Sequence, residues 1–218
     1  MNTLNAEDFH EKMLQEDEYV VLDTRPQETF TQGYIPGSIF IGISSPRFSE
    51  WASLLLPGDR QILLVADVGG ESQVAVALTT AGLKAPLGFL EGGFNAWEKA
   101  GLEKDMIIDV EADELAMDIP FDENLLVLDV RNETEYADGH VRDAMHLPLE
   151  EFTDAANIAL IDEHRTVYVH CKSGYRSVIA ASLLKREGLH NLRNVLGGWD
   201  AISQEDRIEK EKDTKALN

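Results

Sequence analysis

Cys171 is the only cysteine in the 218-residue sequence, and it stands where an apolar run gives way to a helical pattern. Val167-Tyr168-Val169 is typical of a buried strand, and residues 178–184 return apolar side chains at helical spacing. Backbone N–H groups at such a strand-to-helix loop converge on an anion, and the helix N-terminus adds partial positive charge. A thiolate in this environment is a nucleophile of lowered pKa. The pattern therefore predicts a catalytic Cys171; the alternative is a buried structural thiol.

Two cationic residues stand beside the cysteine. Lys172 is expected to point outward and attract anions. Arg176 has two uses that the sequence leaves open. Its guanidinium could point inward and hold the loop through backbone carbonyl groups, or outward toward an anionic substrate.

The seven residues 171–177, Cys-Lys-Ser-Gly-Tyr-Arg-Ser, resemble the active-site loop of rhodanese-type sulfurtransferases, in which the cysteine carries a sulfane sulfur as a persulfide. The resemblance implies ping-pong transfer from thiosulfate or a persulfide to a thiol or cyanide, with no metal or organic cofactor. Trp199 follows Gly197-Gly198 in a segment that resembles a late family motif beside the pocket. The residues that the resemblance assigns to substrate contact are Lys172, Ser173, Gly174, Tyr175, Arg176, Ser177 and Trp199.

The length of the loop separates this family from a neighbouring one. Protein tyrosine phosphatases place an arginine six positions after the nucleophile, but that position here is Ser177, and the arginine comes one residue earlier. By resemblance, the shorter loop fits a sulfur atom better than a phosphate group. A cysteine phosphatase or arsenate reductase of similar fold is the rival enzyme, and a noncatalytic docking module is the other alternative.

Asp129-Val130-Arg131 closes a strand expected to lie beside the strand that leads to Cys171. Both would then end at the carboxyl edge of one parallel sheet, where open α/β sheets bind ligands. By resemblance, Asp129, Arg131 and His140 have mainly structural roles. For His140 and His170 a role in proton handling stays open, as does a simple core role for Trp199, because Phe94 holds its place in the first half.

An internal repeat divides the chain in two. Residues pair at an offset of about 106, as in Val21-Leu22-Asp23 with Val127-Leu128-Asp129, Arg25 with Arg131 and, near the end, Gly92-Gly93 with Gly197-Gly198. This period is a domain length rather than a solenoid repeat. Strand and helix patterns alternate, so we predict two tandem rhodanese-like α/β domains, 1–104 and 105–218, each with a mainly parallel central sheet flanked by helices.

The first half lacks the cysteine. Its loop, residues 66–72, reads Ala-Asp-Val-Gly-Gly-Glu-Ser and is expected to be about two residues shorter than its counterpart, counting back from Gly82 and Gly188. The chain thus resembles tandem rhodaneses with an inactive first domain. It also resembles the rhodanese region that follows a metallo-β-lactamase-like persulfide dioxygenase domain; because the chain has no His-x-His-x-Asp-His sequence, such a partner would be a separate chain or missing.

Composition excludes some partners. The net charge of −21 disfavours nucleic acid, and no apolar run approaches the roughly 20 residues that span a bilayer. One cysteine forms no internal disulfide, so a cytoplasmic protein is expected, acting on a small anionic sulfur donor and a thiol acceptor. A homodimer is left open. The charged end, 204–218, is expected to be a frayed helix or a disordered tail.

Overall fold

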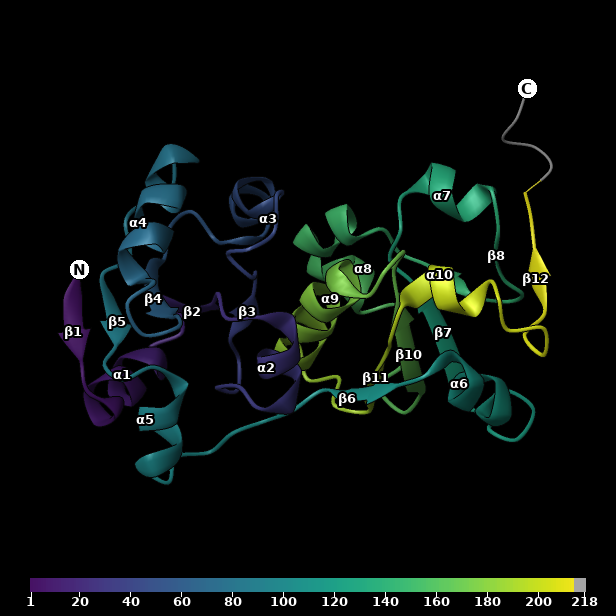
Figure 1. The fold of residues 1–218 in the computed structure, drawn as a ribbon, viewed down its shortest axis with the longest axis horizontal. Coiled ribbons are helices and arrows are strands. Elements are labelled where there is room, and N and C mark those ends of the chain that lie inside the picture. Colours follow the sequence, from purple (N-terminus) through teal and green to yellow (C-terminus); the bar gives the residue numbers. More distant parts are fainter. Residues whose placement is uncertain (214–218) are drawn as a thin grey trace. The chain divides into compact units, whose positions relative to one another are not determined.

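The computed structural model describes residues 1–213, and the chain forms two compact units, Met1–Met106 and Ile107–Asn218. Each unit contains a five-stranded parallel sheet with helices on both faces, so the expected α/β fold with two tandem domains is confirmed (Figure 1). The strand orders are β1-β5-β4-β2-β3 in the first unit and β6-β11-β10-β7-β9 in the second. The two orders are equivalent, as the internal repeat predicts.

The first unit begins with a strand that the sequence reading did not identify. Asn5 then begins the first helix as its N-cap, because its side chain accepts a hydrogen bond from the Asp8 N–H at 2.8 Å. The elements are β1 (Asn2–Leu4), α1 (Ala6–Met13), β2 (Tyr19–Asp23), α2 (Gln27–Gln32), β3 (Ile39–Phe40), α3 (Phe48–Leu55), β4 (Gln61–Val65), α4 (Glu71–Thr80), β5 (Gly88–Leu90) and α5 (Phe94–Lys99). The helix α3 was also missed.

The second unit repeats this succession. Its elements are β6 (Ile108–Val110), α6 (Ala112–Asp118), β7 (Leu125–Asp129), α7 (Glu133–Ala137), β8 (His140–Val141), β9 (Met145–His146), the 3-10 helix η1 (Leu149–Thr153), α8 (Ala155–Ile158), β10 (Thr166–His170), α9 (Tyr175–Arg186), β11 (Leu192–Val195), α10 (Gly198–Ile202) and β12 (Lys210–Glu211). The segment that connects the two units ends at Ile107, because Ile108 begins β6, which pairs with β11.

Different helices pack on the two faces of the second sheet. On one face Tyr168 packs with Leu115 of α6 and Ile202 of α10. Successive side chains of a strand alternate between faces, so Val167 and Val169 of β10 face the opposite side. There α9 crosses β10 and β11 (Figure 1). The strand β10 is therefore buried on both sides, and its carboxyl end carries Cys171 to the sheet edge.

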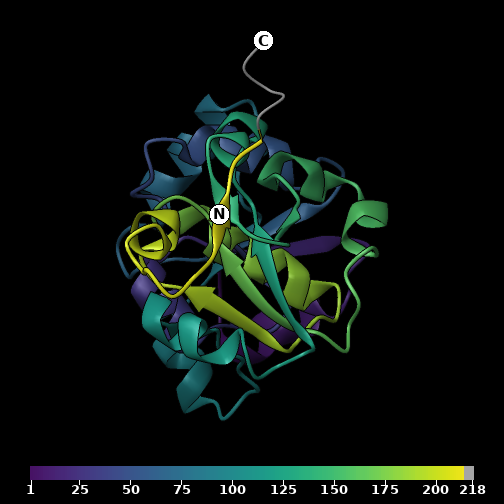
Figure 2. The same cartoon turned by 90° about the vertical axis from the view of Figure 1, so that its right-hand side faces the viewer.

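The expectation for the charged end is wrong as far as residue 213. β12 pairs antiparallel with β8, with Lys210 opposite Val141 (Figure 2). Ile208, only 3% exposed, anchors this segment in the core of the second unit. One buried apolar residue and the pairing with β8 hold this charged segment in place, which a composition argument overlooks. Residues 214–218 of the predicted tail lie outside the described residues.

Candidate active site

Cys171 is the first residue after β10, and β7 lies directly beside that strand, with Asp129 opposite His170. The next turn passes through Gly174, whose φ of 104° is open to glycine and strained for other residues. This turn aims the Gly174 N–H at the Cys171 Sγ, 3.2 Å away, just before α9 begins. The cysteine is 1% exposed. The sequence thus correctly predicted a sulfur held by loop N–H at a strand-to-helix switch.

The paired glycines hold the loop from the other side. The Trp199 N–H donates to the Cys171 carbonyl at 2.7 Å, and the Asp200 N–H donates to the Lys172 carbonyl at 3.0 Å. Gly198 has a φ of 54°, and a Cβ there would collide with the Cys171 carbonyl oxygen. The loop backbone therefore requires glycine at this position, and its carbonyl groups are drawn away into the α10 turn.

Ser177, which the resemblance assigned to substrate contact, lies inside the protein. Its side chain is fully buried, with the hydroxyl 2.8 Å from the Gly174 carbonyl oxygen and 2.6 Å from Asn194 Oδ1. Asn194 in turn donates from Nδ2 to Asp109 Oδ1 at 2.7 Å. This buried network ties the loop to β11 and β6. Sequence reasoning missed Asn194 and Asp109; the available signal was an asparagine at a buried position of β11, directly before Val195.

Arg176 makes neither of the two contacts considered for it. Its guanidinium donates two hydrogen bonds, of 2.7 and 2.8 Å, to the carboxylate of Glu135 on α7. These bonds raise the pKa of Arg176. Burial favours the neutral form of Glu135, but the bonds from Arg176 outweigh it and hold the pKa of that carboxyl below its usual value. The arginine charge beside Cys171 is therefore neutralised within the protein.

The remaining loop side chains lie near the surface. Lys172 and Ser173 are exposed and Tyr175 is half-buried. Within the described part of the chain, Lys172 makes no ion pair, so it is a loop cation available to an incoming anion. Sequence reasoning missed Glu135 because the residue also has a local use: it closes a capping box with Asn132 at the start of α7.

Asp129 and Arg131 form a fully buried ion pair. Arg131 donates to both carboxylate oxygens at 2.6 to 3.0 Å and to the Gly139 carbonyl at 2.7 Å. The Trp199 ring lies over the guanidinium, 4.5 Å from its centroid to Cζ. The Trp199 side chain thus packs on this pair, which supports the core role left open for it.

The same arrangement recurs in the first unit without a cysteine. Arg25 binds Asp23 and the Gly33 carbonyl, and the Phe94 ring lies 4.3 Å from the guanidinium carbon. An identical cluster that serves no cysteine is a fold element. It connects the end of the second strand of each unit with the turn that follows the next helix.

The two histidines are held by backbone groups rather than by the sulfur. His140 stacks on Tyr136 with 3.8 Å between ring centroids, and its Nδ1 lies 2.9 Å from the Tyr136 carbonyl oxygen. His170 is fully buried, with Nδ1 3.2 Å from the Cys171 carbonyl oxygen and Nε2 3.6 Å from Asp129 Oδ2. Burial lowers the pKa of His170, and the Asp129 charge opposes this only in part. A neutral imidazole therefore supports the loop backbone at neutral pH.

In the equivalent loop of the first unit, a carboxylate of the loop itself accepts the backbone N–H. Sheet register places Val65 opposite Asp23 as it places His170 opposite Asp129, so Ala66 holds the place of Cys171. The Glu71 carboxylate accepts the Gly69 N–H at 3.0 and 3.1 Å. The offset between units changes from 105 at this strand end to 106 at the glycines that follow the two helices, so the loop is one residue shorter, not two.

Two further findings concern membrane insertion and metal binding. Within residues 1–213, no helix has the length and apolar character needed to cross a bilayer. Over the same residues, no group of three or more histidine, cysteine, aspartate or glutamate side chains is placed to hold a metal ion.

Comparison with known proteins places both units in one family. The rhodanese-like domain matches residues 5–100 and 111–205. A putative sulfur carrier protein of Bacillus subtilis, YrkF, is 32% identical over 108 residues, which are 50% of this chain and 55% of that protein. A sulfurtransferase of Allochromatium vinosum is 29% identical over 93 residues, 43% of this chain and 85% of the other. The chain thus spans about half the length of the first relative.

Solved structures show the same similarity. The rhodanese-like domain of an Anabaena protein is 24% identical and covers 52% of this chain and 85% of its own, with a TM-score of 0.45. A thiosulfate sulfurtransferase from Pseudomonas aeruginosa is 22% identical and covers 97% of this chain and 44% of its own, with a TM-score of 0.42. Because the family match covers most of the sequence in two successive segments, the chain belongs to the rhodanese-like domain family and carries two copies of the domain.

Proposed function

We propose that the second unit is a sulfurtransferase in which Cys171 carries the transferred sulfur as a persulfide, and that the first unit has no such activity. The observation that carries the proposal is the contact between the Gly174 N–H and the Cys171 Sγ, at the start of α9 and 3.2 Å long. A donor in this position favours an anion on the sulfur. The first unit has an alanine at the corresponding place.

The reaction takes two steps of displacement at sulfur. In the first, the Cys171 thiolate attacks the outer sulfur of the donor, a new S–S bond forms, and the donor's own bond to that sulfur breaks. The electron pair leaves with sulfite when the donor is thiosulfate, or with a thiolate when it is a persulfide. In the second, an acceptor thiolate or cyanide attacks the outer sulfur of the Cys171 persulfide, and the thiolate of Cys171 leaves. No electrons are gained or lost overall.

The charges around the loop bear on the donor. Thiosulfate is a dianion, whereas an alkyl persulfide carries a single negative charge. The carboxylate of Glu135 cancels the charge of Arg176, which leaves the exposed Lys172 and the loop N–H groups to meet the donor. This arrangement favours a persulfide donor over thiosulfate, with a thiol as acceptor.

The test is mass spectrometry of the whole chain after incubation with either thiosulfate or glutathione persulfide. One added sulfur on the peptide that contains Cys171, removed by a thiol acceptor, is the expected result. Cys171→Ser keeps nearly the same shape but forms no persulfide, so it serves as the control. Absence of the added sulfur with both donors, combined with turnover of an aryl phosphate that Cys171→Ser abolishes, would replace the proposal with the phosphatase.

A further inference from the structure

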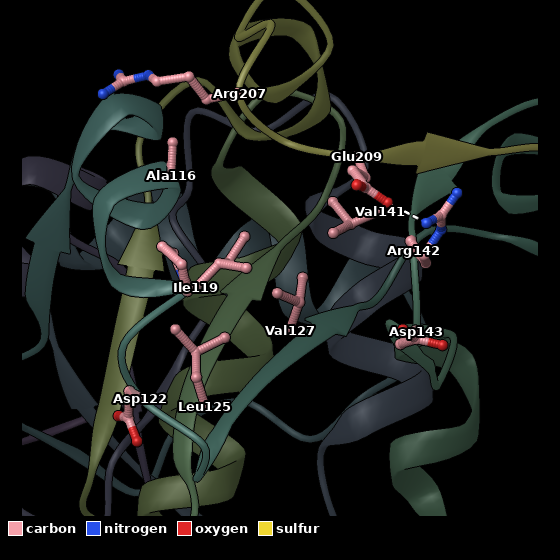
Figure 3. A pocket seen from close by; sticks show the side chains of 11 residues that line it. Ala116, Ile119, Asp122, Leu125, Val127, Val141, Arg142, Asp143, Arg207 and Glu209 are labelled. Carbon is pink, nitrogen blue, oxygen red and sulfur yellow. Dashed lines mark ion pairs between the residues drawn. The ribbon is translucent and has the colours of Figure 1, made fainter.

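A cavity of about 580 Å³ opens in the second unit, away from Cys171. It lies between the end of α6, the start of β7 and the segment that leads into β12. Leu125 at the amino end of β7 lines it, whereas Cys171 follows the carboxyl end of the neighbouring strand. The apolar side chains that line it are Pro120 and the five labelled in Figure 3: Ala116, Ile119, Leu125, Val127 and Val141. The cavity is within the size range of ligand sites, and the reaction of Cys171 does not use it.

The fold itself does not require this cavity. The strand registers relate the two units at an offset of 106, since Asp23 pairs with Phe40 as Asp129 pairs with His146. At this offset, the first unit has larger side chains at three of the lining positions. Ala116 corresponds to His10, Leu125 to Tyr19, and Val141 to Ile35.

In the first unit the larger side chains at these positions pack against the core. The His10 ring packs on Trp97 with 5.5 Å between centroids, and Met13 and Tyr19 pack against the same core. Trp97 itself corresponds to the smaller Ile202 in the second unit. Unfilled apolar space lowers the stability of a domain. The second unit has the smaller side chain at all four positions and carries the cavity, which indicates that it receives a side chain from elsewhere.

The charged residues at the rim of the cavity indicate which charge a binding partner should carry. Its two arginines are already paired, Arg142 with Glu209 and Arg207 with Glu205. Asp122 and Asp143 lie on opposite sides of the apolar floor (Figure 3). Neither aspartate has an ion-pair partner within residues 1–213. The uncompensated charge at the rim is therefore negative, as is that of the whole chain at −21, and a cationic partner is favoured.

The apolar surface continues outside the cavity. Met117, Ile119 and Phe121 are 50%, 37% and 87% exposed, on the last turn of α6 and the turn that follows it. A patch of this kind beside a pocket is typical of protein interfaces, in which a large side chain enters the pocket and its neighbours cover the rim. We propose that the cavity and this patch dock a segment of a partner protein that carries a large apolar side chain next to lysine or arginine.

The test selects binders with a random heptapeptide phage library on the immobilised full chain. Enriched sequences should combine an aromatic or large aliphatic residue with an adjacent lysine or arginine. The cavity-filled variant Ala116→His/Leu125→Tyr takes its residues from the first unit. Synthetic peptides from the selection should bind it at least about tenfold more weakly, because the anchor pocket is gone.

The charge is tested separately. Asp122→Asn and Asp143→Asn should each weaken binding about two- to fivefold, the size of an exposed ion pair, and less so at high salt. Glu16→Gln, at the position in the first unit that matches Asp122, should change nothing. Sulfur transfer between small molecules and the thermal unfolding of each variant check that the second unit is still folded.

Three results would overturn the proposal. The selected peptides could bind the filled variant as tightly as the parent chain, or the library could yield acidic or no enriched sequences. Self-association of the chain that Ala116→His/Leu125→Tyr abolishes would show that a second copy, rather than a basic partner, covers the patch. If the filled variant does not fold, equal binding by the parent and by Asp122→Asn/Asp143→Asn overturns it instead.

Discussion

The two units have the same sheet order but use the N–H groups of one loop differently. In the second unit the Gly174 N–H faces the sulfur of Cys171, and the glycine pair 197–198 holds the loop open around it. In the first unit the Glu71 carboxylate accepts the corresponding loop donor, from Gly69, and an alanine stands in place of the cysteine. The fold thus supplies an anion position in both copies. Only the second copy leaves it for a reactive anion.

The largest expected effect comes from moving the cysteine. Cys171→Ser should lower sulfur transfer by about a thousandfold or more, because the nucleophile itself is lost. Ala66→Cys in that background should not restore it, since Glu71 already occupies the loop donor. A coupled assay with glutathione persulfide and a thiol acceptor measures both. Activity recovered in the double variant Cys171→Ser/Ala66→Cys would show that the hydrogen bonds of Glu71 in the first loop are no obstacle to sulfur transfer.

The next effect concerns the glycine beside the loop. Gly198→Ala should remove most of the activity, because a methyl group there meets the carbonyl groups of Cys171 and Lys172 and the backbone must shift. The strain should also lower the free energy of unfolding by about 1–3 kcal/mol. Gly93→Ala, at the matching place in the first unit, is the control. It can destabilise its own unit, but loss of sulfur transfer equal to that of Gly198→Ala would contradict a local role.

A smaller effect on activity is expected when the charge of Arg176 is no longer neutralised by Glu135. Glu135→Gln keeps the capping box at the start of α7 but removes the charge that neutralises Arg176. Transfer from thiosulfate should rise about fivefold in kcat/KM, the scale of one partly exposed charge interaction, and transfer from a singly charged persulfide should rise less. Both gains should shrink with salt.

Glu133→Gln, two residues earlier on the same helix, gives the control for net charge. An equal gain with that variant would mean that Glu135 acts through the overall charge of the domain. Unchanged or lower thiosulfate activity in Glu135→Gln would mean that the pair with Arg176 shapes the loop and does not tune its charge.

Local patterns predicted the parts of this comparison that depend on neighbours in sequence. The alternation of strands and helices, the repeat and the position of Cys171 at a strand end are properties of a short stretch or of its copy. Hydrogen-bond partners that come from distant segments of the chain could not be predicted from the sequence. Glu135 lies 41 residues from Arg176, and Asp109 lies 85 residues from Asn194. The charged segment around Ile208 is held by a core position and by a strand, β8, about 70 residues earlier in the chain.

The last and smallest effect is in the dependence of stability on pH, and it again separates the two units. His170 is buried with a lowered pKa, and the matching residue of the first unit is Val65. The unfolded chain binds a proton at His170 below its ordinary pKa of about 6.5, while the folded chain does not, so protonation favours unfolding. The stability contributed by the neutral imidazole is complete above that pH and declines as the pH falls through it.

Asp129, whose pKa is lowered, loses its contribution only at more acidic pH, below the ordinary value of 3.8. Between pH 7 and 5, amide exchange corrected for its intrinsic rate should therefore show β10 losing protection relative to β4, by up to about 2 kcal/mol. His170→Val should remove this dependence in β10. A slope that persists in the variant would assign it to groups other than the imidazole beneath the Cys171 loop.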